Sequence, residues 1–239
     1  MGDRCLERGA FMRGSAGALA VAALAGIPRG ARGAYSGAPT VTPDQALARL
    51  MAGNAKFVAG TLAPAQALVE RRADVANGQR PFAMVLCCAD SRVPPEQIFD
   101  QSVGDLFVCR VAGNILESGG LGSFEYAIAN IGSPALLIVL GHQKCGAVTD
   151  SIKLLQSEQR APASIQTIVE AIAPAVKATA RGTMAEGEYT EAVVRANAKL
   201  VAHEIVTRSS IVDKAVHAHH LKVVAAHYAL ASGKVTLLP

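Results

Sequence analysis

Two short segments of this chain carry residue types that bind transition metals. Cys88 opens the sequence Cys-Ala-Asp-Ser-Arg, and His142 stands three residues before Cys145 further along the chain. Two cysteine thiolates and one imidazole make three ligands for a zinc ion and leave the fourth coordination position open. Structural zinc sites usually close with four Cys or His ligands, so this set predicts a metal site with chemistry to perform.

Each of these segments follows a short apolar run. Residues 82–87 and 135–140 read as buried parallel strands, because a strand covered on both faces is apolar throughout. Pro94, Pro95 and Glu96 suit the start of a helix, and a helical stretch over residues 146–155 follows Gly141. Ligands of open α/β sheets bind beyond the carboxyl ends of the strands, so we expect both halves of the site at that edge.

The motifs resemble those of the β class of carbonic anhydrases. The family pattern C-x-D-S-R, followed later by H-x-x-C-G, is matched over residues 88–92 and 142–146. Further similar blocks occupy residues 94–100, 104–107, 110–114 and 122–127, with weaker similarity over 46–60 and 228–238. The resemblance implies an α/β fold with a mostly parallel central β-sheet flanked by helices, and N-terminal helices that pack on a partner subunit.

The resemblance also implies an activity, the zinc-dependent reversible hydration of carbon dioxide to bicarbonate and a proton by metal-bound hydroxide. Cys88, His142 and Cys145 would hold one Zn²⁺ per subunit. Zinc lowers the pKa of its bound water to about 7. Two thiolates cancel the formal charge of Zn²⁺, however, so groups outside the ligand set must help.

By resemblance to the family, Asp90 and Arg92 form a catalytic dyad. The Asp90 carboxylate would orient the hydroxide by accepting its hydrogen bond, and Arg92 would keep that carboxylate ionised. In some family members the corresponding aspartate instead binds the metal and displaces the water. Asp90 is therefore also a candidate metal ligand, in a closed state only.

The implied substrate contacts lie outside the zinc ligands. The resemblance assigns Gln79 as a hydrogen-bond donor to bicarbonate and assigns an apolar pocket, whose last member can come from a neighbouring subunit, to Phe107, Ala112 and Tyr126. Gly146, which follows ligand Cys145, is the remaining candidate for substrate binding. The expected partners are CO2, bicarbonate and further copies of the chain in a homodimer or homotetramer.

A subset of the family has a second, inhibitory bicarbonate site built from a tryptophan, an arginine and a tyrosine. Arg110 and Tyr228 match two of its positions, but Val85 stands at the tryptophan position and the chain contains no Trp. We therefore expect this site to be absent.

The N-terminal segment has the composition of an export signal. Arg4, Arg8 and Arg13 precede a small apolar stretch over residues 16–27, and residues 31–38 offer small-residue cleavage positions. Residues 8–13 resemble a twin-arginine signal in which Gly9 replaces the second arginine. We expect residues 1–39 to be an export signal and linker of a periplasmic protein, with a cytoplasmic enzyme as the alternative. The stretch is too short for a convincing membrane span, so none is expected in the mature protein.

Residues 40–239 are expected to form a single zinc-dependent catalytic domain, since 239 residues with 51% hydrophobic content can bury one sizeable core. The formal net charge is +4. Residues 1–33 contribute +3 of this, from five arginines against Asp3 and Glu7, which leaves +1 for the rest. No basic patch remains, so nucleic-acid binding is not indicated.

The other predicted elements form a scaffold. Helices are expected from Thr42 or Asp44 to residue 57, and over 65–76, 164–180 and 186–206, with a break at 208–210. Strands 221–229 and 234–238 flank Ser232-Gly233 and should form an antiparallel hairpin at the edge of the sheet.

Cys5 falls in the expected export signal, and Cys87, Cys109 and the remaining histidines are assigned to the scaffold. Cys87 should face away from the site, because successive strand side chains alternate. Both Cys87 and Cys109 are expected to act as small buried hydrophobes. A solvated loop is expected for His217, His219 and His220. Surface or packing roles are expected for His203 and His227.

Two other functions remain open on the same residues. The first is hydrolysis of carbonyl sulfide or carbon disulfide, which related proteins carry out on this type of zinc site and which differs from CO2 hydration in the access to the pocket. The second is a non-catalytic module whose zinc only joins two loops, although such a role gives no reason for Asp90 and Arg92.

Overall fold

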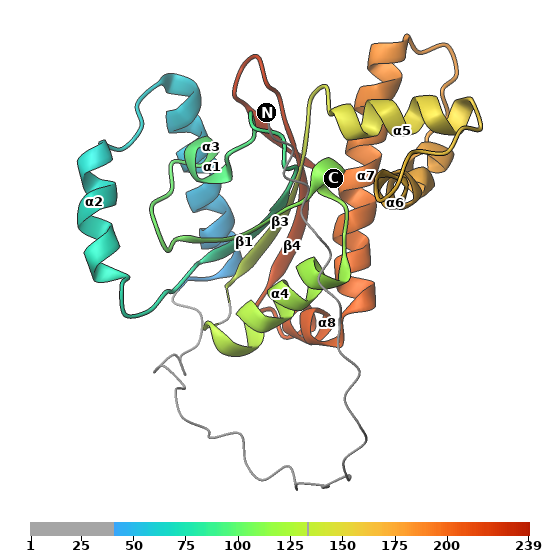
Figure 1. Ribbon diagram of the computed structural model, residues 1–239. Helices are drawn as coiled ribbons and strands as arrows, with labels where there is room; N and C mark the ends of the chain where they lie inside the picture. The colour runs from blue at the N-terminus through green and yellow to red at the C-terminus, as the bar shows by residue number, and fades with distance from the viewer. Residues whose placement is uncertain (1–40, 133) are drawn as a thin grey trace, which may run out of the picture. The chain divides into compact units, whose positions relative to one another are not determined.

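The computed structural model describes residues 41–132 and 134–239, so the export signal expected over residues 1–39 lies outside the described residues. The strands are β1 (Ala83–Cys87), β2 (Leu106–Arg110), β3 (Leu136–His142), β4 (Lys222–Tyr228) and β5 (Val235–Leu238). They form one sheet in the order β2-β1-β3-β4-β5, in which only β5 runs antiparallel to its neighbour (Figure 1). The predicted mostly parallel sheet with an antiparallel hairpin at its edge is confirmed.

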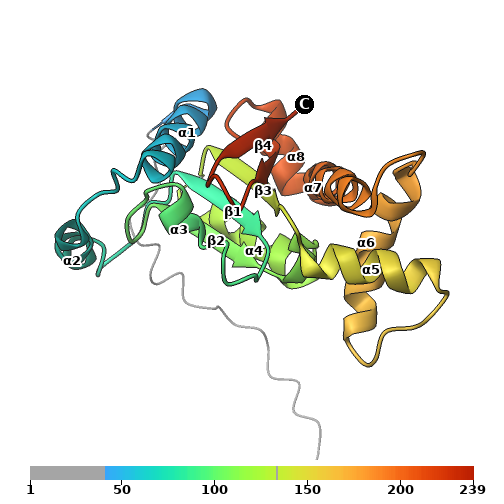
Figure 2. The same ribbon diagram turned by 90° about the horizontal axis from the view of Figure 1, so that it is seen from above.

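Helices cover both faces of this sheet. They are α1 (Pro43–Ala59), α2 (Ala65–Asp74), α3 (Pro95–Ile98), α4 (Ser118–Asn130), α5 (Gly146–Gln156), α6 (Ile165–Ala178), α7 (Glu186–Arg208) and α8 (Ser210–His217), with a 3-10 turn η1 (Ala112–Asn114). One face packs against α1 and α3, and the other against α4, α7 and α8 (Figure 2). None of the helices in the described part of the chain is long and apolar enough to cross a bilayer.

The two cores follow from the alternation of side chains along each strand. In β1, Val85 and Cys87 pack with α1 and α3, whereas Leu86 packs with the helices on the other face. Every residue of β1 and β3 is buried, which explains their continuous apolar runs. Cys87 thus faces away from Cys88, as predicted, and burial raises the pKa of its thiol to about 12.

Helix α1 packs directly on backbone that follows β1. A Cβ atom at Gly53 would lie 1.7 Å from the carbonyl oxygen of Phe99, so only glycine permits this approach. Its neighbour Asn54 donates to the carbonyls of Ile98 (3.1 Å) and Gly233 (2.8 Å). The amide of Asn54 therefore joins α1 to α3 and to the β4–β5 hairpin.

The predicted helices and strands are present with small shifts at their ends, but β2, α4 and α8 were missed. Strand β2 is only half-buried at the edge of the sheet, and α4 contains three glycines, which disfavour a helix. Helix α8 starts directly after the predicted break, where Ser209 Oγ accepts a hydrogen bond from the Val212 amide (3.2 Å). His217 therefore ends a helix, which corrects the expected loop, while His219 and His220 lie in the exposed turn beyond it.

Candidate metal centre

The three predicted metal ligands lie where the winding of the sheet changes direction. The chain passes from β1 to β2 on one side and from β3 to β4 on the other, so the switch point falls between β1 and β3. Cys88 follows β1, His142 ends β3, and Cys145 directly precedes α5. Such a switch point at the carboxyl edge is where open α/β sheets bind ligands.

The ligand atoms of these residues converge. One ring nitrogen of His142 and the sulfur atoms of Cys88 and Cys145 all lie within 4.8 Å of one another. Ligand atoms about 2.0 to 2.3 Å from one tetrahedral zinc ion are roughly 3.5 to 3.8 Å apart, so little movement is needed to enclose an ion. All three residues are buried, at 5% exposure or less.

The tautomer of His142 suits metal binding. Its Nδ1 lies 2.9 Å from the carbonyl oxygen of Gln143, and because a carbonyl can only accept, Nδ1 carries the proton. Nε2 then presents a lone pair, yet it is buried with no hydrogen-bond partner among the described residues. A buried acceptor without a donor is costly, and a metal ion would satisfy it.

The two cysteine thiols influence each other's protonation. A hydrogen bond from Cys145 lowers the pKa of the Cys88 thiol well below its usual value. The same contact, together with burial, raises the pKa of Cys145 above its usual range. Two adjacent buried thiolates need a positive charge between them, and soft sulfur ligands with imidazole favour zinc over hard cations. The donor set therefore fits Zn²⁺.

Backbone amides also contact the first of these sulfur atoms. Cys88 Sγ accepts hydrogen bonds from the amides of Asp90 (3.4 Å) and Gly113 (3.3 Å). Gly113 belongs to η1, which lies beside the centre. Amide donors stabilise negative charge on the sulfur, so they favour the thiolate form.

Asp90 and Arg92 pair as predicted. Asp90 Oδ1 accepts from the amide and Nε of Arg92 (both 2.9 Å), and Oδ2 accepts from Nη2 (2.6 Å). These bonds hold the pKa of the Asp90 carboxyl well below its usual range. Asp90 Oδ2 also lies 3.9 Å from His142 Nε2, so an ionised acceptor stands beside the three ligands.

Arg110 forms hydrogen bonds with the backbone of the segment that carries Asp90, a role that the sequence did not reveal. Its Nε donates to the carbonyl of Cys88 (3.2 Å) and its Nη2 to the carbonyl of Asp90 (2.6 Å). The guanidinium that matched the inhibitory bicarbonate site is therefore engaged with backbone. Tyr228, the second match, is buried in β4.

Of the residues expected to contact substrate, some lie near the metal centre and others do not. Ala112 lies in η1 and Gly146 begins α5, so both are next to metal ligands in the fold. Gln79 is exposed and precedes β1, whereas the ligands follow the other end of that strand, roughly 15 Å away for five residues. One chain therefore does not bring Gln79 to the centre. Phe107 lies on the edge strand β2, and Tyr126 on α4 is 57% exposed.

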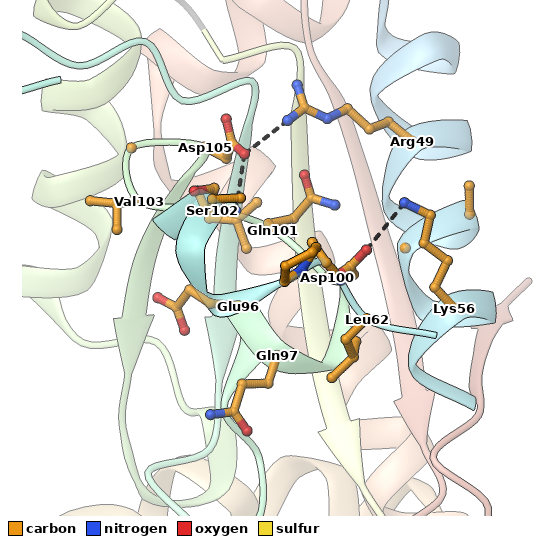
Figure 3. Close-up of a pocket in the computed structure, with 17 residues that line it drawn as sticks. Arg49, Lys56, Leu62, Glu96, Gln97, Asp100, Gln101, Ser102, Val103 and Asp105 are labelled. Atoms are coloured by element: carbon orange, nitrogen blue, oxygen red, sulfur yellow. Dashed lines mark hydrogen bonds and ion pairs between the residues drawn. The ribbon is translucent and has the colours of Figure 1, made fainter. Parts of the chain in front are cut away.

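A hollow separate from the metal centre lies between α1, α2 and the segment that joins α3 to β2 (Figure 3). Its volume is about 710 Å³, and no thiol or imidazole lines it. Four of its charged groups form ion pairs, Arg49 with Asp105 (2.9 Å) and Lys56 with Asp100 (3.2 Å). This hollow, which we call the α1–α2 groove, is therefore not a second metal centre.

Comparisons with known proteins agree with this geometry. A family model described as "Carbonic anhydrase" matches residues 83–235. "Carbonic anhydrase 2" of Mycobacterium tuberculosis is 36% identical over 200 residues, covering 83% of this chain and 94% of that protein. The carbonic anhydrase of Mycolicibacterium smegmatis is also 36% identical, covering 83% and 95%.

Solved structures resemble the fold as well. One comes from work on two tetrameric β-carbonic anhydrases of the fungus Sordaria macrospora, with a TM-score of 0.65 at 21% identity, covering 73% of this chain and 88% of that one. Family and fold thus agree along most of the described chain. We conclude that the chain belongs to the β-class carbonic anhydrases, a family of enzymes.

Proposed function

We propose that this chain catalyses the reversible hydration of carbon dioxide to bicarbonate and a proton with one Zn²⁺ per subunit. The observation that carries the proposal is the convergence of Cys88, His142 and Cys145 beside the Asp90–Arg92 pair. When bound, zinc supplies a nucleophile at neutral pH, because it lowers the pKa of a coordinated water.

Asp90 orients the attacking oxygen in this proposal. Its ionised carboxylate can only accept hydrogen bonds, so it directs the proton of the nucleophile toward itself and leaves a lone pair free for CO2. Three hydrogen bonds from Arg92 hold the carboxylate in one orientation. For Asp90 to become a metal ligand, the bonds from the Arg92 side chain to Asp90 would have to rearrange. The pairing therefore supports the state in which Asp90 serves the nucleophile.

Two bacterial relatives are named carbonic anhydrases, which supports CO2 as the substrate over carbonyl sulfide and carbon disulfide. Stopped-flow hydration of CO2 by the zinc-loaded chain tests the proposal, with carbonyl sulfide hydrolysis measured beside it. Rapid hydration supports carbonic anhydrase activity. A zinc-loaded chain that hydrolyses carbonyl sulfide and leaves CO2 unchanged would support the second activity, and silence toward both would favour a structural zinc.

A homodimer would complete the site, with a homotetramer as the larger alternative. Strand β2 is an edge strand, and pairing two copies antiparallel through β2 would set the amino edge of one sheet beside the carboxyl edge of the other. The partner's Gln79 would then lie near the metal centre. The α1–α2 groove adjoins β2 and exposes Leu62 and Val103 at 44% and 47%, which supports packing of the N-terminal helices on a partner.

A shared site predicts complementation between two inactive variants. We expect Gln79→Ala and Asp90→Ala homodimers each to lose activity, and mixed dimers to regain it at one of their two sites. In a mixed dimer, one centre combines an intact Asp90 with the partner's intact Gln79. The measurement is CO2 hydration after unfolding and refolding the two variants together. Activity of the mixture that equals the average of the two homodimers would contradict a shared site.

Export and domain organisation form a separate part of the proposal. Residues 1–39 would direct the chain to the periplasm, and residues 40–239 would form the single catalytic domain. Fractionation of a bacterial host that expresses the full chain with a C-terminal tag tests this part. A shortened protein in the periplasm supports export, whereas a full-length protein in the cytoplasm supports the alternative.

A further inference from the structure

The turn η1 has an unusual backbone beside the metal centre. Gly113 (φ 70°) and Asn114 (φ 44°) are both left-handed, a conformation that L side chains rarely adopt. A Cβ at Gly113 would also lie 2.8 Å from Cδ1 of Ile172. This conformation directs the Gly113 amide at Cys88 Sγ, 3.3 Å away. Something outside the turn must hold it in this shape.

Asn197 of α7 contacts the turn from the far side. Its Nδ2 donates to the Gly113 carbonyl at 2.9 Å, across 84 residues of sequence. Asn197 is completely buried, and its Oδ1 has no donor among the described residues. Because a half-satisfied buried amide is a poor stabiliser, stability alone does not explain this residue. Its one bond fixes the peptide that follows Gly113, and through the Gly113 backbone it restrains the preceding peptide, whose N–H donates to Cys88.

This orientation matters for the charge on the ligand sulfur. An amide that donates to a thiolate withdraws negative charge from it, so the sulfur gives less charge to a bound metal. Two thiolates would otherwise offset most of the metal's acidity. The Gly113 amide is therefore one source of the help that the ligand set requires.

The same helix contacts the loop between the other two ligands. Only Gln143 and Lys144 separate His142 from Cys145, and Lys144 is left-handed (φ 53°). Its amide donates to Glu191 Oε1 of α7 at 2.8 Å. The other oxygen of Glu191 accepts from His227 Nε2 on β4, also at 2.8 Å.

Burial and hydrogen bonds keep this carboxylate in place. Burial alone would raise the pKa of Glu191, but the bonds from His227 and from the Lys144 amide outweigh it and lower the pKa. Val194, about one turn further along α7, packs closely against Gly141. A Cβ atom added at Gly141 would lie only 3.1 Å from Cγ1 of Val194. Gly141 directly precedes His142, so three residues of α7 spaced three positions apart contact the backbone around the ligands, namely Glu191, Val194 and Asn197.

We propose that Asn197 and Glu191 of α7 are positioning residues that set the two halves of the metal centre, the first through Gly113 and the second through Lys144. Neither residue touches the metal or the substrate in this scheme. The inference rests on the proposed zinc site. It adds that one helix, α7, sets the orientation of the backbone that carries the ligands.

The test measures metal binding by the full chain rather than turnover. We expect Asn197→Leu, which keeps the branching of the side chain and removes the donor, to shift the thiolate-to-metal charge-transfer band of the cobalt(II)-loaded protein to lower energy. Zinc affinity, measured by competition with a chelator, should fall by about tenfold to a hundredfold. Asn197→Ala serves as the second variant if the leucine protein does not fold.

Variants of Glu191 test the other half. Glu191→Leu should weaken zinc binding by a similar factor, whereas Glu191→Gln, which retains an acceptor for the Lys144 amide, should recover most of the affinity. The matched control is Thr190→Val, because Thr190 is also buried on α7 but its hydroxyl donates to Glu186 within the helix (2.9 Å).

Each result decides the inference. Folded Asn197 and Glu191 variants with the wild-type spectrum and affinity would overturn it, and so would a Thr190→Val protein with the same losses. A wild-type chain that binds neither cobalt nor zinc would overturn the proposed zinc site, and the inference with it. The wild-type measurement therefore separates the two failures.

Discussion

Replacing Asp90 with alanine lowers kcat for CO2 hydration by about a hundredfold or more, while the zinc content stays at one ion per chain. The variant retains all three metal ligands and loses the acceptor that orients the nucleophile. Stopped-flow hydration and metal analysis of the same preparation check both parts. Asp150→Ala is the matched control, since Asp150 is an exposed carboxylate on α5 close in sequence to Cys145.

An Arg92→Ala variant distinguishes the charge of Asp90 from its orientation. Removing Arg92 lets the pKa of Asp90 rise from its lowered value toward the ordinary value of about 3.9. Asp90 therefore remains ionised at pH 7 in Arg92→Ala, and any loss of activity there reports lost orientation. An Asp90→Ala protein with undiminished turnover would exclude the aspartate from the mechanism and favour a site that works through the metal alone.

The second large effect concerns two neighbouring cysteines. Cys88→Ala should reduce bound zinc from one per chain to nearly none and abolish CO2 hydration, because a thiolate ligand is lost. Cys87→Ala should retain both zinc and activity, since the Cys87 thiol packs on the opposite face of the sheet. It should cost only the packing of a small side chain, about 1 to 2 kcal/mol.

Thermal unfolding with and without a chelator provides an independent measure of the same site. A metal that binds only the folded chain raises its stability by mass action, so the chelator should lower the Tm of the wild type and of Cys87→Ala. It should have no effect on Cys88→Ala. Equal zinc loading in the two cysteine variants would rule out the assigned ligand set.

Much of the fold and of the metal centre could be predicted from local sequence. The continuous apolar runs of β1 and β3 are typical of strands buried on both faces, and the structure buries both strands completely. Residue types and spacing identified Cys88, His142 and Cys145, because few side chains bind zinc. The pairing of Asp90 with Arg92 was also predicted, but for an extended chain, whereas Ser91 and Arg92 lie in a turn that brings the Arg92 amide and side chain back onto the Asp90 carboxylate.

Tertiary structure decided the features that depend on distant contacts. Strand β2 and the glycine-rich helix α4 have weak local signals, because packing rather than propensity stabilises them. Arg110, Glu191 and Asn197 contact the backbone beside the ligands from 20, 47 and 84 residues away in sequence, and no short motif announces such bonds.

Residue types and spacing in this sequence thus indicated the candidate metal ligands and the strands that carry them. Only the folded chain showed that one helix contacts the backbone on both sides of the centre, and that Gln79 precedes β1 while the candidate ligands lie beyond the other end of the strands. The physical reason is that ligand chemistry is a property of individual side chains. The orientation of a ligand depends on buried hydrogen bonds, which form only when distant segments pack together.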